Sequence, residues 1–563
     1  MGVRGLVAGI DIGNATTEVV LGRVAADGVA LVGAGQAPTR RQKGSPESIA
    51  GAAALVRRLE RQHGVRATGA VVAPLRPVRT QVAELPPEEL PTGRLRVVRA
   101  GSSTAGGAGV GVGRPVLVGA EAAGSDPVIV VVPRGIRYDA VPAQVASLSA
   151  AGRLAAVLVE DDEGVLVAHR LGVPVPVVDE VPADAVLSAT RVAVEVAEDG
   201  RPLRVLTDAL RLRALLDLSE DELADAAAAA GALFDVTNAV VTLDPGRQPA
   251  ASTPQGWVEL RDLGRLPFAE GQRRLRRETV GAATAYALPP ACDSEPVDDL
   301  WTVDLGDVAG AVRARRDGVG SRSIGVASMH SDAPYVDPAD GLSALLGVPV
   351  VTAGSESRAA RVGALSTPGA VADAVVVDLG GGTVDVVSDD SAVVAAGAGS
   401  LLTASVAALS VSTQAAAEWV KRGPAHRVET PQLMLGEDGA RTFLDRPAPA
   451  ETLGSLVVRG PAGLLAFSRT MSPGEWRALR LALKTDLVGA NVRRALRTLD
   501  ASPRAVVVVG GPAADDEVLA AVTGALPAGV AVGRGDVMGS LGTRYAVACG
   551  LLHTGLSDAA PAG

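Results

Sequence analysis

The feature that most constrains the fold is a short segment that occurs twice in similar form. Residues 376–387 have the sequence V-V-D-L-G-G-G-T-V-D-V-V, in which an apolar strand ends at Asp378, three glycines turn the chain and a second strand begins at Thr383. Residues 9–20, G-I-D-I-G-N-A-T-T-E-V-V, repeat this scheme with Asp11 in place of Asp378. An ordinary glycine-rich hairpin is an adequate explanation of either segment alone, but the repetition favours a shared function.

Both segments predict a phosphate-binding turn. Glycine lets backbone N–H groups approach an anion closely, because it has no Cβ atom. We therefore expect phosphate to be bound by two sets of residues. These are Asn14, Ala15 and Thr16 in the first hairpin, and Gly380, Gly381, Gly382 and Thr383 in the second.

The carboxylates of the two hairpins predict a cation beside the phosphates. A carboxylate repels a phosphate unless a cation lies between them, and Mg²⁺ prefers oxygen ligands. Hydrolysis of a phosphoanhydride also needs a polarised water in line with the terminal phosphate. Asp11, Asp378 and Asp385 are therefore the candidate catalytic residues, and the sequence leaves open which of them orients the water.

A third segment completes the pattern. Residues 506–512, V-V-V-V-G-G-P, predict a strand that runs into a turn at Gly510 and Gly511. Two Asp-x-Gly hairpins followed by a late strand and Gly-Gly turn occur in this order in actin, hexokinase and the heat-shock chaperones, where the hairpins hold phosphates from opposite lobes. The sequence therefore predicts an α/β, actin-like (ribonuclease H-like) two-lobed ATPase that uses ATP/ADP and Mg²⁺.

The spacing of the hairpins predicts an inserted domain. Asp11 and Asp378 are 367 residues apart, whereas one lobe of such an ATPase needs only ~100–200 residues. We expect four regions. They are the first part of the ATPase at 1–91, an inserted α/β domain at 92–255, the remaining ATPase body at 256–555, and a frayed tail at 556–563.

Apolar patterns predict individual elements in these regions. In the insert we expect strands at Val128–Val132, Ala155–Val159 and Val165–Val167, and a helix near Ala143–Gly152. In the ATPase body, residues 473–499 predict a long helix. One face of this helix carries Trp476, Leu479, Leu483 and Leu487, and we expect that face to be core.

Composition excludes several classes of function. The net charge of −10 argues against a nucleic-acid partner. No apolar stretch reaches the roughly 18 residues of a membrane span. Cys292 and Cys549 are far apart and belong to no C-x-x-C pair, which is typical of a protein of the reducing cytoplasm.

Segments along nearly the whole chain, from Gly9 to about Leu552, resemble the large subunit of the diol and glycerol dehydratase reactivases. They are A-G-I-D-I-G-N-A-T-T-E-V, S-S-T-A-G-G-A-G-V-G-V-G, D-D-E-G-V-L-V-A-H-R-L, P-V-P-V-V-D-E-V, G-V-A-S-M, G-A-L-S-T-P-G, V-V-D-L-G-G-G-T-V-D and V-V-V-G-G-P. The middle segments are the most specific, because generic actin-like ATPases and sugar kinases lack them.

This resemblance implies an ATP-dependent, chaperone-like reactivating factor. Such a factor releases damaged cobalamin from an inactivated adenosylcobalamin-dependent diol or glycerol dehydratase, so that intact coenzyme can replace it. The implied partners are that dehydratase and a small reactivase subunit, in a complex of two large and two small subunits. The insert corresponds to the swivelling domain of the family. Whether the client is a diol or a glycerol dehydratase is left open.

The resemblance also implies two further sites. Glu418 and Lys421 lie on one helix face at i, i+3 spacing, and with Gly510 and Gly511 they are expected to contact adenine and ribose. A surface ion pair explains Glu418 and Lys421 equally well.

Thr104, Asp161 and Asp179 are implied ligands of a metal at the contact with the small subunit. Their oxygens suit Mg²⁺ or Ca²⁺. The alternative is an acidic turn at Glu160–Glu163, in which an extra residue leaves the choice between Asp161 and Asp162 open.

Two other functions fit the predicted fold. One is a kinase that phosphorylates a sugar or polyol, and the other is an actin-like ATPase that forms filaments. The specific middle segments favour the reactivating factor over both.

Overall fold

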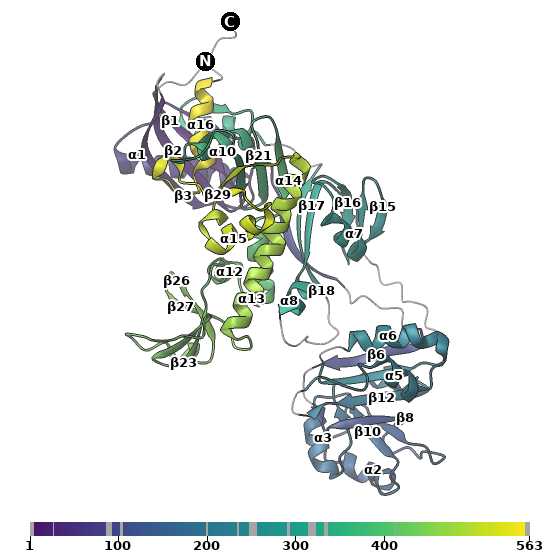
Figure 1. The fold of residues 1–563 in the computed structure, drawn as a ribbon. Coiled ribbons are helices and arrows are strands. Elements are labelled where there is room, and N and C mark those ends of the chain that lie inside the picture. The colour runs from purple at the N-terminus through teal and green to yellow at the C-terminus, as the bar shows by residue number, and fades with distance from the viewer. Residues whose placement is uncertain are drawn as a thin grey trace. The chain divides into compact units, whose positions relative to one another are not determined.

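The structure is a computed structural model of the 563-residue chain. It describes residues 5–25, 28–85, 93–101, 105–198, 201–233, 236–246, 256–289, 293–312, 322–331, 336–410 and 412–557. The chain divides into two compact units (Figure 1). Unit 1 contains Met1–Leu85, Pro254–Val312 and Ser323–Gly563, and unit 2 contains Pro86–Thr253 and Arg313–Arg322.

Two sheets of unit 1 have the same topology. The first-lobe sheet has the order β19(Val350–Thr352)-β4(Gly69–Val72)-β1(Gly5–Ile12)-β2(Thr16–Ala25)-β3(Gly28–Pro38). The second-lobe sheet has the order β29(Ala531–Arg534)-β28(Ala505–Val509)-β20(Val375–Leu379)-β21(Thr383–Val387)-β22(Ala392–Ala396). In both sheets the last three strands of this order form an antiparallel meander. The first three strands are parallel to one another: β19, β4 and β1 in the first sheet, and β29, β28 and β20 in the second. This duplicated arrangement is the predicted actin-like, ribonuclease H-like fold.

Helices cover these sheets, and their ends follow from local sequence. α1 (Pro46–His63) begins after Ser45, whose side chain accepts a hydrogen bond from the Ser48 N–H, and ends at Gly64 in the left-handed conformation. α10 (Glu356–Leu365) begins after Ser355 in the same way. α10 packs closely on α16 (Ala546–Ser557), since a Cβ atom at Gly363 would lie 1.9 Å from the Ala546 carbonyl oxygen. The other helices of unit 1 are α7(Phe268–Leu275), α8(Leu305–Val312), α9(Ala339–Leu346), α11(Gly399–Leu409), α12(Gln414–Val420), α13(Pro473–Lys484), α14(Ala490–Leu499) and α15(Asp516–Ala525).

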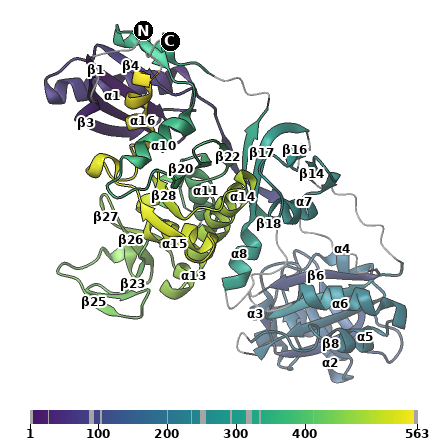
Figure 2. The same ribbon diagram turned by 45° about the horizontal axis from the view of Figure 1, so that its top comes forward.

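Two further sheets belong to unit 1 (Figure 2). One has the order β15(Gly264–Pro267)-β14(Trp257–Leu260)-β16(Ala283–Ala287)-β17(Glu295–Asp304)-β18(Arg322–His330)-β5(Arg79–Leu85). The other, which we call the outer sheet, has the order β25(Arg441–Phe443)-β24(Leu433–Gly436)-β23(His426–Thr430)-β26(Leu456–Gly460)-β27(Gly463–Ser468).

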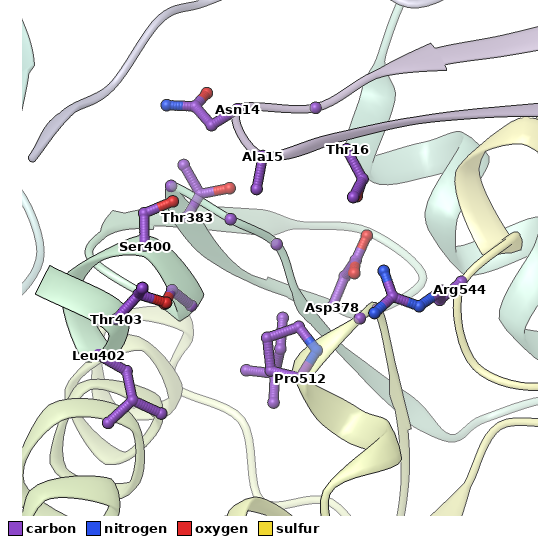
Figure 3. A pocket seen from close by; sticks show the side chains of 18 of the residues that line it. Asn14, Ala15, Thr16, Asp378, Thr383, Ser400, Leu402, Thr403, Pro512 and Arg544 are labelled. Carbon is purple, nitrogen blue, oxygen red and sulfur yellow. The ribbon is translucent and has the colours of Figure 1, made fainter. Parts of the chain in front are cut away.

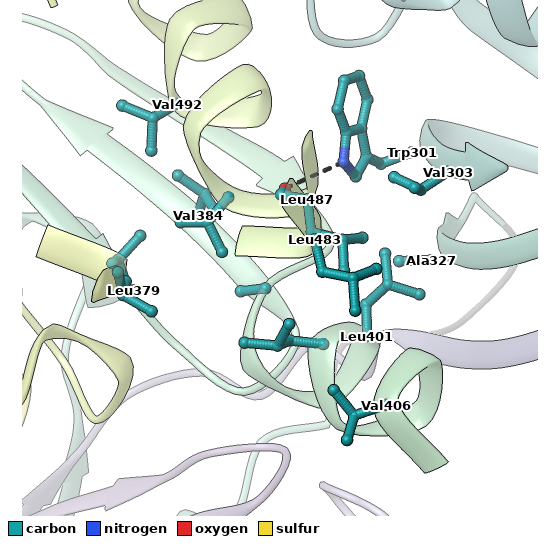
Figure 4. Close-up of a cluster of buried hydrophobic side chains, with 14 of the residues drawn as sticks. Trp301, Val303, Ala327, Leu379, Val384, Leu401, Val406, Leu483, Leu487 and Val492 are labelled. Atoms are coloured by element: carbon teal, nitrogen blue, oxygen red, sulfur yellow. Dashed lines mark hydrogen bonds between the residues drawn. The ribbon is translucent and has the colours of Figure 1, made fainter. Parts of the chain in front are cut away.

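The predicted core stripe is confirmed. Trp476, Leu479, Leu483 and Leu487 are all buried, in the cluster that also contains the second-lobe strands β20 and β21. The predicted long helix consists of α13, a π-helical turn at Thr485–Gly489 and α14. At this turn the Trp301 Nε1–H donates to the Leu487 carbonyl at 3.1 Å, as Figure 4 shows.

Unit 2 is an α/β domain with its own cores. Its sheet has the order β6(Leu95–Gly101)-β13(Asn238–Leu243)-β12(Arg191–Val196)-β8(Gly109–Leu117)-β9(Val128–Val132)-β10(Leu154–Val159)-β11(Val177–Val178)-β7(Ala105–Gly106). Its helices are α2(Val141–Ala150), α3(Gly164–Leu171), α4(Ala183–Leu187), α5(Ala209–Leu216) and α6(Leu223–Ala232). Three apolar clusters lie wholly within this unit.

One predicted element and part of another are wrong. The expected strand Val165–Val167 lies in the helix α3, in which Val167 is buried while Val165 and Leu166 are exposed. A strand would have buried alternate residues instead. At the C-terminus, α16 extends to Ser557, two residues into the expected tail 556–563, and the rest of that tail lies outside the described residues.

Within the described ranges, no single helix is long and apolar enough to cross a membrane. α11 and α12 pass the length and composition test only as a pair, and they are bent by 101° at their junction.

Candidate functional site

The two predicted hairpins face each other across a cleft in unit 1. The turn between β1 and β2 closes with a hydrogen bond from Gly13 N–H to the Thr16 carbonyl, and Gly380 and Thr383 form the equivalent bond between β20 and β21, each at 2.9 Å. Figure 3 shows Asn14, Ala15 and Thr16 opposite Thr383. The two turns thus have the same hydrogen-bond geometry and border the same cleft.

Close approach explains why glycines are needed in the second turn. A Cβ atom at Gly381 would lie 3.0 Å from the Ala15 nitrogen, and one at Gly382 would lie 2.8 Å from Asn14 Nδ2. Real Cβ atoms essentially never lie under 3.0 Å from another heavy atom, so Gly382 has no room for a side chain. The two turns therefore approach each other closely, with Gly381 against the Ala15 backbone and Gly382 against the Asn14 side chain.

The structure brings all of the predicted catalytic and nucleotide-binding residues into this cleft, whose volume is about 1300 Å³. The predicted residues that line it are Asp11, Asn14, Ala15, Thr16, Asp378, Gly380, Gly381, Gly382, Thr383, Asp385, Glu418, Lys421, Gly510 and Gly511. Gly510 has φ +92°, and a Cβ atom there would lie 2.2 Å from the Leu379 carbonyl oxygen. Only glycine fits at this turn.

Glu418 and Lys421 pair with each other and with Thr403. Lys421 Nζ lies 2.8 Å from Glu418 Oε1 and 2.7 Å from Thr403 Oγ1, and the Thr403 hydroxyl also donates to Glu418 Oε1. The Lys421 side chain is only 14% exposed. Burial lowers the pKa of Lys421, although Glu418 opposes this shift. The pair therefore lines the cleft, with the Lys421 ammonium mostly buried and the Glu418 side chain 40% exposed.

The part of the cleft next to the two hairpin turns holds an excess of carboxylates. Asp11, Glu18, Glu356, Asp378 and Asp385 line it, together with the cations Lys43 and Arg544. Burial, and then the charges of Glu356 and Glu18, raises the pKa of Asp11 well above its usual value. Burial also raises the pKa of Asp378, with Asp385 as the next cause. Burial and Glu356 raise the pKa of Asp385 to about 6.

These carboxylates fit a hydrated divalent cation. Asp11 Oδ1 and Asp385 Oδ1 are buried and have no hydrogen-bond partner in the structure. The other oxygen of Asp385 accepts a hydrogen bond from the Ser357 hydroxyl at 3.0 Å. No three His, Cys, Asp or Glu side chains of the described residues converge as direct ligands of one metal ion. The donor set therefore suits Mg²⁺ that keeps waters between itself and the protein.

The structure adds cleft residues that the sequence patterns did not identify: Glu18, Lys43, Glu356, Ser400 and Arg544. Lys43 follows β3, Glu356 starts α10 and Arg544 precedes α16. The sequence did contain one signal for Lys43, because the whole chain has only three lysines.

The predicted metal site of unit 2 is only partly described, because Thr104 lies outside the described residues. Asp179 is buried, and its Oδ2 accepts a hydrogen bond from Gly164 N–H at 3.3 Å, at the start of α3. Asp161 Oδ2 accepts from Gly135 N–H at 3.1 Å. The acidic turn thus holds the loop after β9, and a metal role for Asp161 or Asp162 stays a prediction.

Comparison with known protein families gives a match in each unit. Residues 294–555 match the family model of the diol dehydratase reactivase ATPase-like domain. Residues 97–248 match the model of the DD-reactivating factor swiveling domain.

Full-length relatives agree with these family models. The propanediol dehydratase-reactivating factor large subunit of Citrobacter freundii is 28% identical over 97% of this chain and 98% of that protein. The Salmonella typhimurium protein of the same name is 29% identical with the same coverage.

Solved structures agree as well. A glycerol dehydratase reactivase superposes with a TM-score of 0.70 at 27% identity, covering 98% of this chain and all of that chain. A diol dehydratase-reactivating factor in nucleotide-free form gives the same TM-score at 26% identity and the same coverage. With both family models, full-length relatives and solved structures in agreement, the chain belongs to the diol dehydratase reactivase family, as a member of its large-subunit type.

Proposed function

We propose that this chain is the ATP-hydrolysing large subunit of a factor that reactivates an adenosylcobalamin-dependent diol or glycerol dehydratase. The observation that carries the proposal is the pair of facing backbone turns, with carboxylates behind each turn, in a chain of this family. The relatives favour this function over a sugar kinase or a filament-forming ATPase, since those named above are reactivating factors.

In this proposal the two hairpins bind the phosphates of ATP and the Gly510 turn lies against the adenosine, with Glu418 and Lys421 on the ribose. Asp11, Asp378 and Asp385 would hold a hydrated Mg²⁺, which would supply positive charge to neutralise the phosphates. One of these carboxylates orients the water that attacks the terminal phosphate. Because the turns belong to different lobes, a bound nucleotide links the lobes together.

Reactivation requires the nucleotide state to change the affinity for a protein partner. The proposed partners are a small reactivase subunit, in a complex of two large and two small subunits, and the inactivated dehydratase. Exchange of damaged for intact cobalamin takes place in the cytoplasm. Thr104, Asp179 and either Asp161 or Asp162 are the proposed ligands of a second cation, at the junction with the small subunit. Three protein ligands leave a divalent ion with positions that a partner's carboxylate can fill.

The test of the ATPase is to replace the hairpin carboxylates with isosteric amides. Asp11→Asn and Asp378→Asn each remove a charge that Mg²⁺ needs, so we expect kcat for ATP hydrolysis to fall by roughly 10²-fold or more. Phosphate release from the purified chain with ATP and Mg²⁺ is the measurement. Asp390→Asn is the matched control, because Asp390 is exposed beyond the far end of β21. Equal rates in all three variants would contradict an ATPase at this cleft.

The reactivating function has its own readout. A cobalamin-blocked dehydratase is mixed with the large and small subunits, ATP, Mg²⁺ and fresh adenosylcobalamin, and its activity is followed. We expect recovery only when ATP and the unsubstituted large subunit are both present. Recovery without ATP would contradict the proposal, and phosphorylation of a polyol in place of recovery would favour the kinase.

A further inference from the structure

The three lysines of this chain are all buried at or beside the cleft. The sequence contains 53 lysines and arginines, of which only Lys43, Lys421 and Lys484 are lysine. Their side chains are 7%, 14% and 0% exposed. Lys43 and Lys421 line the cleft, and Lys484 pairs with Asp515 and Glu517, which also line it. The chain has arginine at every other one of these 53 positions, so the ammonium group of lysine occurs only at these three.

Lysine and arginine are not interchangeable at a crowded anion site. The ammonium of lysine is a compact point charge with three donors, whereas the guanidinium is a larger, planar fork. On a solvated surface either group serves, so the retention of lysine at three buried positions indicates a local requirement for the smaller cation.

Lys43 is fixed to the first phosphate hairpin. It lies in the loop between β3 and α1, and Thr39 in this loop bonds back to the hairpin. The Thr39 hydroxyl donates to the Gly13 carbonyl at 2.8 Å, and Thr39 N–H donates to the Ala15 carbonyl at 3.0 Å. At its other end the loop is held by Gly44 N–H, which donates to the Ser48 hydroxyl at 3.1 Å. The ammonium is therefore positioned relative to the turn that faces the second hairpin.

The ammonium of Lys43 lies among the carboxylates next to the two hairpin turns. Its Nζ is 3.2 and 3.4 Å from the two carboxylate oxygens of Glu356. Asp11 and Asp385 are near enough for their charges to act on it, and together with Glu356 they outweigh the effect of burial, so the pKa of Lys43 is raised. Lys43 thus pairs with Glu356 in the cleft that Asp11 and Asp385 also line.

We propose that Lys43 is a further catalytic residue, whose ammonium contacts the terminal phosphate of bound ATP between the two hairpins. This inference rests on the ATP hydrolysis proposed above. In that reaction the water oxygen forms a bond to the terminal phosphorus, and the bond from this phosphorus to the bridging oxygen breaks. ADP leaves with the electron pair, and the proton lost by water passes to the released phosphate. Lys43 exchanges no proton and supplies fixed positive charge to the terminal phosphate oxygens.

A chemical probe tests the contact directly. An acyl phosphate of ATP carries an acyl group on the terminal phosphate, and an amine close to that phosphate takes the group. The lysine ammonium loses a proton to solvent, and its nitrogen then bonds to the acyl carbon and gives up a second proton. The carbon–oxygen bond to the phosphate breaks, and ATP leaves with the electron pair. With only three lysines in the chain, peptide mass spectrometry assigns the acylated residue without ambiguity. We expect Lys43 to be acylated, and excess ATP to suppress the reaction.

The Arg66→Lys variant supplies an internal reference for the labelling. Arg66 is exposed in the first lobe, so the new lysine reports reaction that does not depend on binding. Direct measurement of ATP binding, by isothermal titration, accompanies the labelling. Acylation of Lys421 alone, or ATP binding with no ATP-suppressible acylation of Lys43, overturns the inference and leaves the proposed function standing. Absence of ATP binding overturns the proposed function itself.

Kinetics provide a second, independent measurement. Lys43→Arg keeps the charge but not the compact shape, and Lys43→Met removes the charge. We expect kcat to fall roughly 10²–10³-fold in both variants, as for loss of one charge-stabilising donor. Arg66→Lys, the converse exchange on the surface, is expected to keep the unsubstituted rate. Contact with the terminal phosphate would be ruled out by two results together: full kcat in the Lys43→Arg variant, and no acylation of Lys43 in the unsubstituted chain.

Discussion

At the scale of single residues, Arg480 of α13 is a buried charge with many hydrogen bonds. Its side chain is 1% exposed and forms two bidentate pairs, with Glu437 at 2.6 and 2.9 Å and with Glu517 at 2.6 and 2.7 Å. Glu437 follows β24 in the outer sheet and Glu517 lies in the first turn of α15. One guanidinium therefore joins α13 to the outer sheet and to the helix that follows the Gly510 turn.

Removal of this guanidinium should destabilise unit 1 strongly. Arg480→Met leaves Glu437 without its guanidinium partner and leaves Glu517 with Lys484 alone. Breaking a buried pair in this way costs about 3–5 kcal/mol of unfolding free energy. Urea unfolding followed by tryptophan fluorescence measures the effect, and all four tryptophans, Trp257, Trp301, Trp419 and Trp476, belong to unit 1. Arg477→Met is the matched control on the exposed side of α13 and should change the free energy by no more than about 0.5 kcal/mol. Equal midpoints for the two variants would show that the network contributes little.

Residues of the cleft differ in how far sequence alone could place them. The hairpin residues from Asp11 to Thr16 were predictable, because strand, turn and carboxylate follow one another within a few positions. Lys43 and Glu356 were not, because their contact joins residues 313 positions apart. No local pattern encodes that approach, and only the scarcity of lysine singles out Lys43 before folding.

At the scale of elements, the helix α6 of unit 2 begins at a carboxylate, that of Glu222, which takes part in both a capping box and an ion pair. Glu222 lies in the short turn Glu220–Glu222 before this helix and forms a capping box with Ser219. It also pairs with Arg94, just before β6, through bonds of 2.7 and 2.9 Å. The hydrogen bond from Arg94 lowers the pKa of Glu222 to about 2.

This depressed pKa predicts how the contribution of Glu222 depends on pH. A carboxyl group with a lower pKa in the folded than in the unfolded state stabilises the fold at pH above the unfolded value, here about 4.5. The stabilisation declines as pH falls from about 4.5 towards 2. Glu222→Gln should therefore reduce the stability around α6 at pH 7 by about 0.2–1 kcal/mol, since the pair is partly solvated, and the difference should shrink at low pH.

Peptide-resolved hydrogen exchange of β6 and α6, corrected for intrinsic rates, measures this contribution between pH 3 and pH 7 in ~1-unit steps. Glu220→Gln is the control, because Glu220 is exposed in the same turn. A Glu222→Gln difference that stays constant or grows as the solution becomes more acidic would contradict the argument.

A helix or strand could be predicted from the sequence where its apolar pattern, its length and its end signals all indicate the same element. A short apolar run without such signals fits either a helix or a strand. The helix at Pro46–His63 follows from its Ser45 cap, its proline at the first position and Gly64 at its end. The run Val165–Val167 fits a strand or a helix, and in the structure it lies in the helix α3, where only Val167 of the three is buried. The π-helical turn at Thr485–Gly489 was beyond prediction, because its Leu487 carbonyl is bonded by Trp301, 186 positions away.

At the scale of the whole molecule, the chain combines a duplicated ATPase fold with a domain that has its own hydrophobic cores. The duplication was predictable from the two hairpins, and the presence of an additional domain from their 367-residue separation. The arrangement of the strands in each sheet was not, because it is set by pairings between distant segments, such as β19 with β4 and β28 with β20. The family models match 97–248 and 294–555, which leaves the limits of the insert to experiment.

Limited proteolysis of the intact chain tests the proposed insert, residues 92–255. We expect the first cuts at 86–92 and 244–255, because these stretches are rich in proline and polar residues and separate one set of cores from the other. The three apolar clusters of unit 2 lie between Leu95 and Leu243, so a fragment between the cuts keeps its entire core and should resist further digestion. Mass spectrometry of early fragments locates the cuts, and addition of ATP with Mg²⁺ should slow later cleavage within unit 1 without moving these first two. Early cuts between 97 and 248, with 86–92 and 244–255 intact, would mean that the insert does not hold together as one domain.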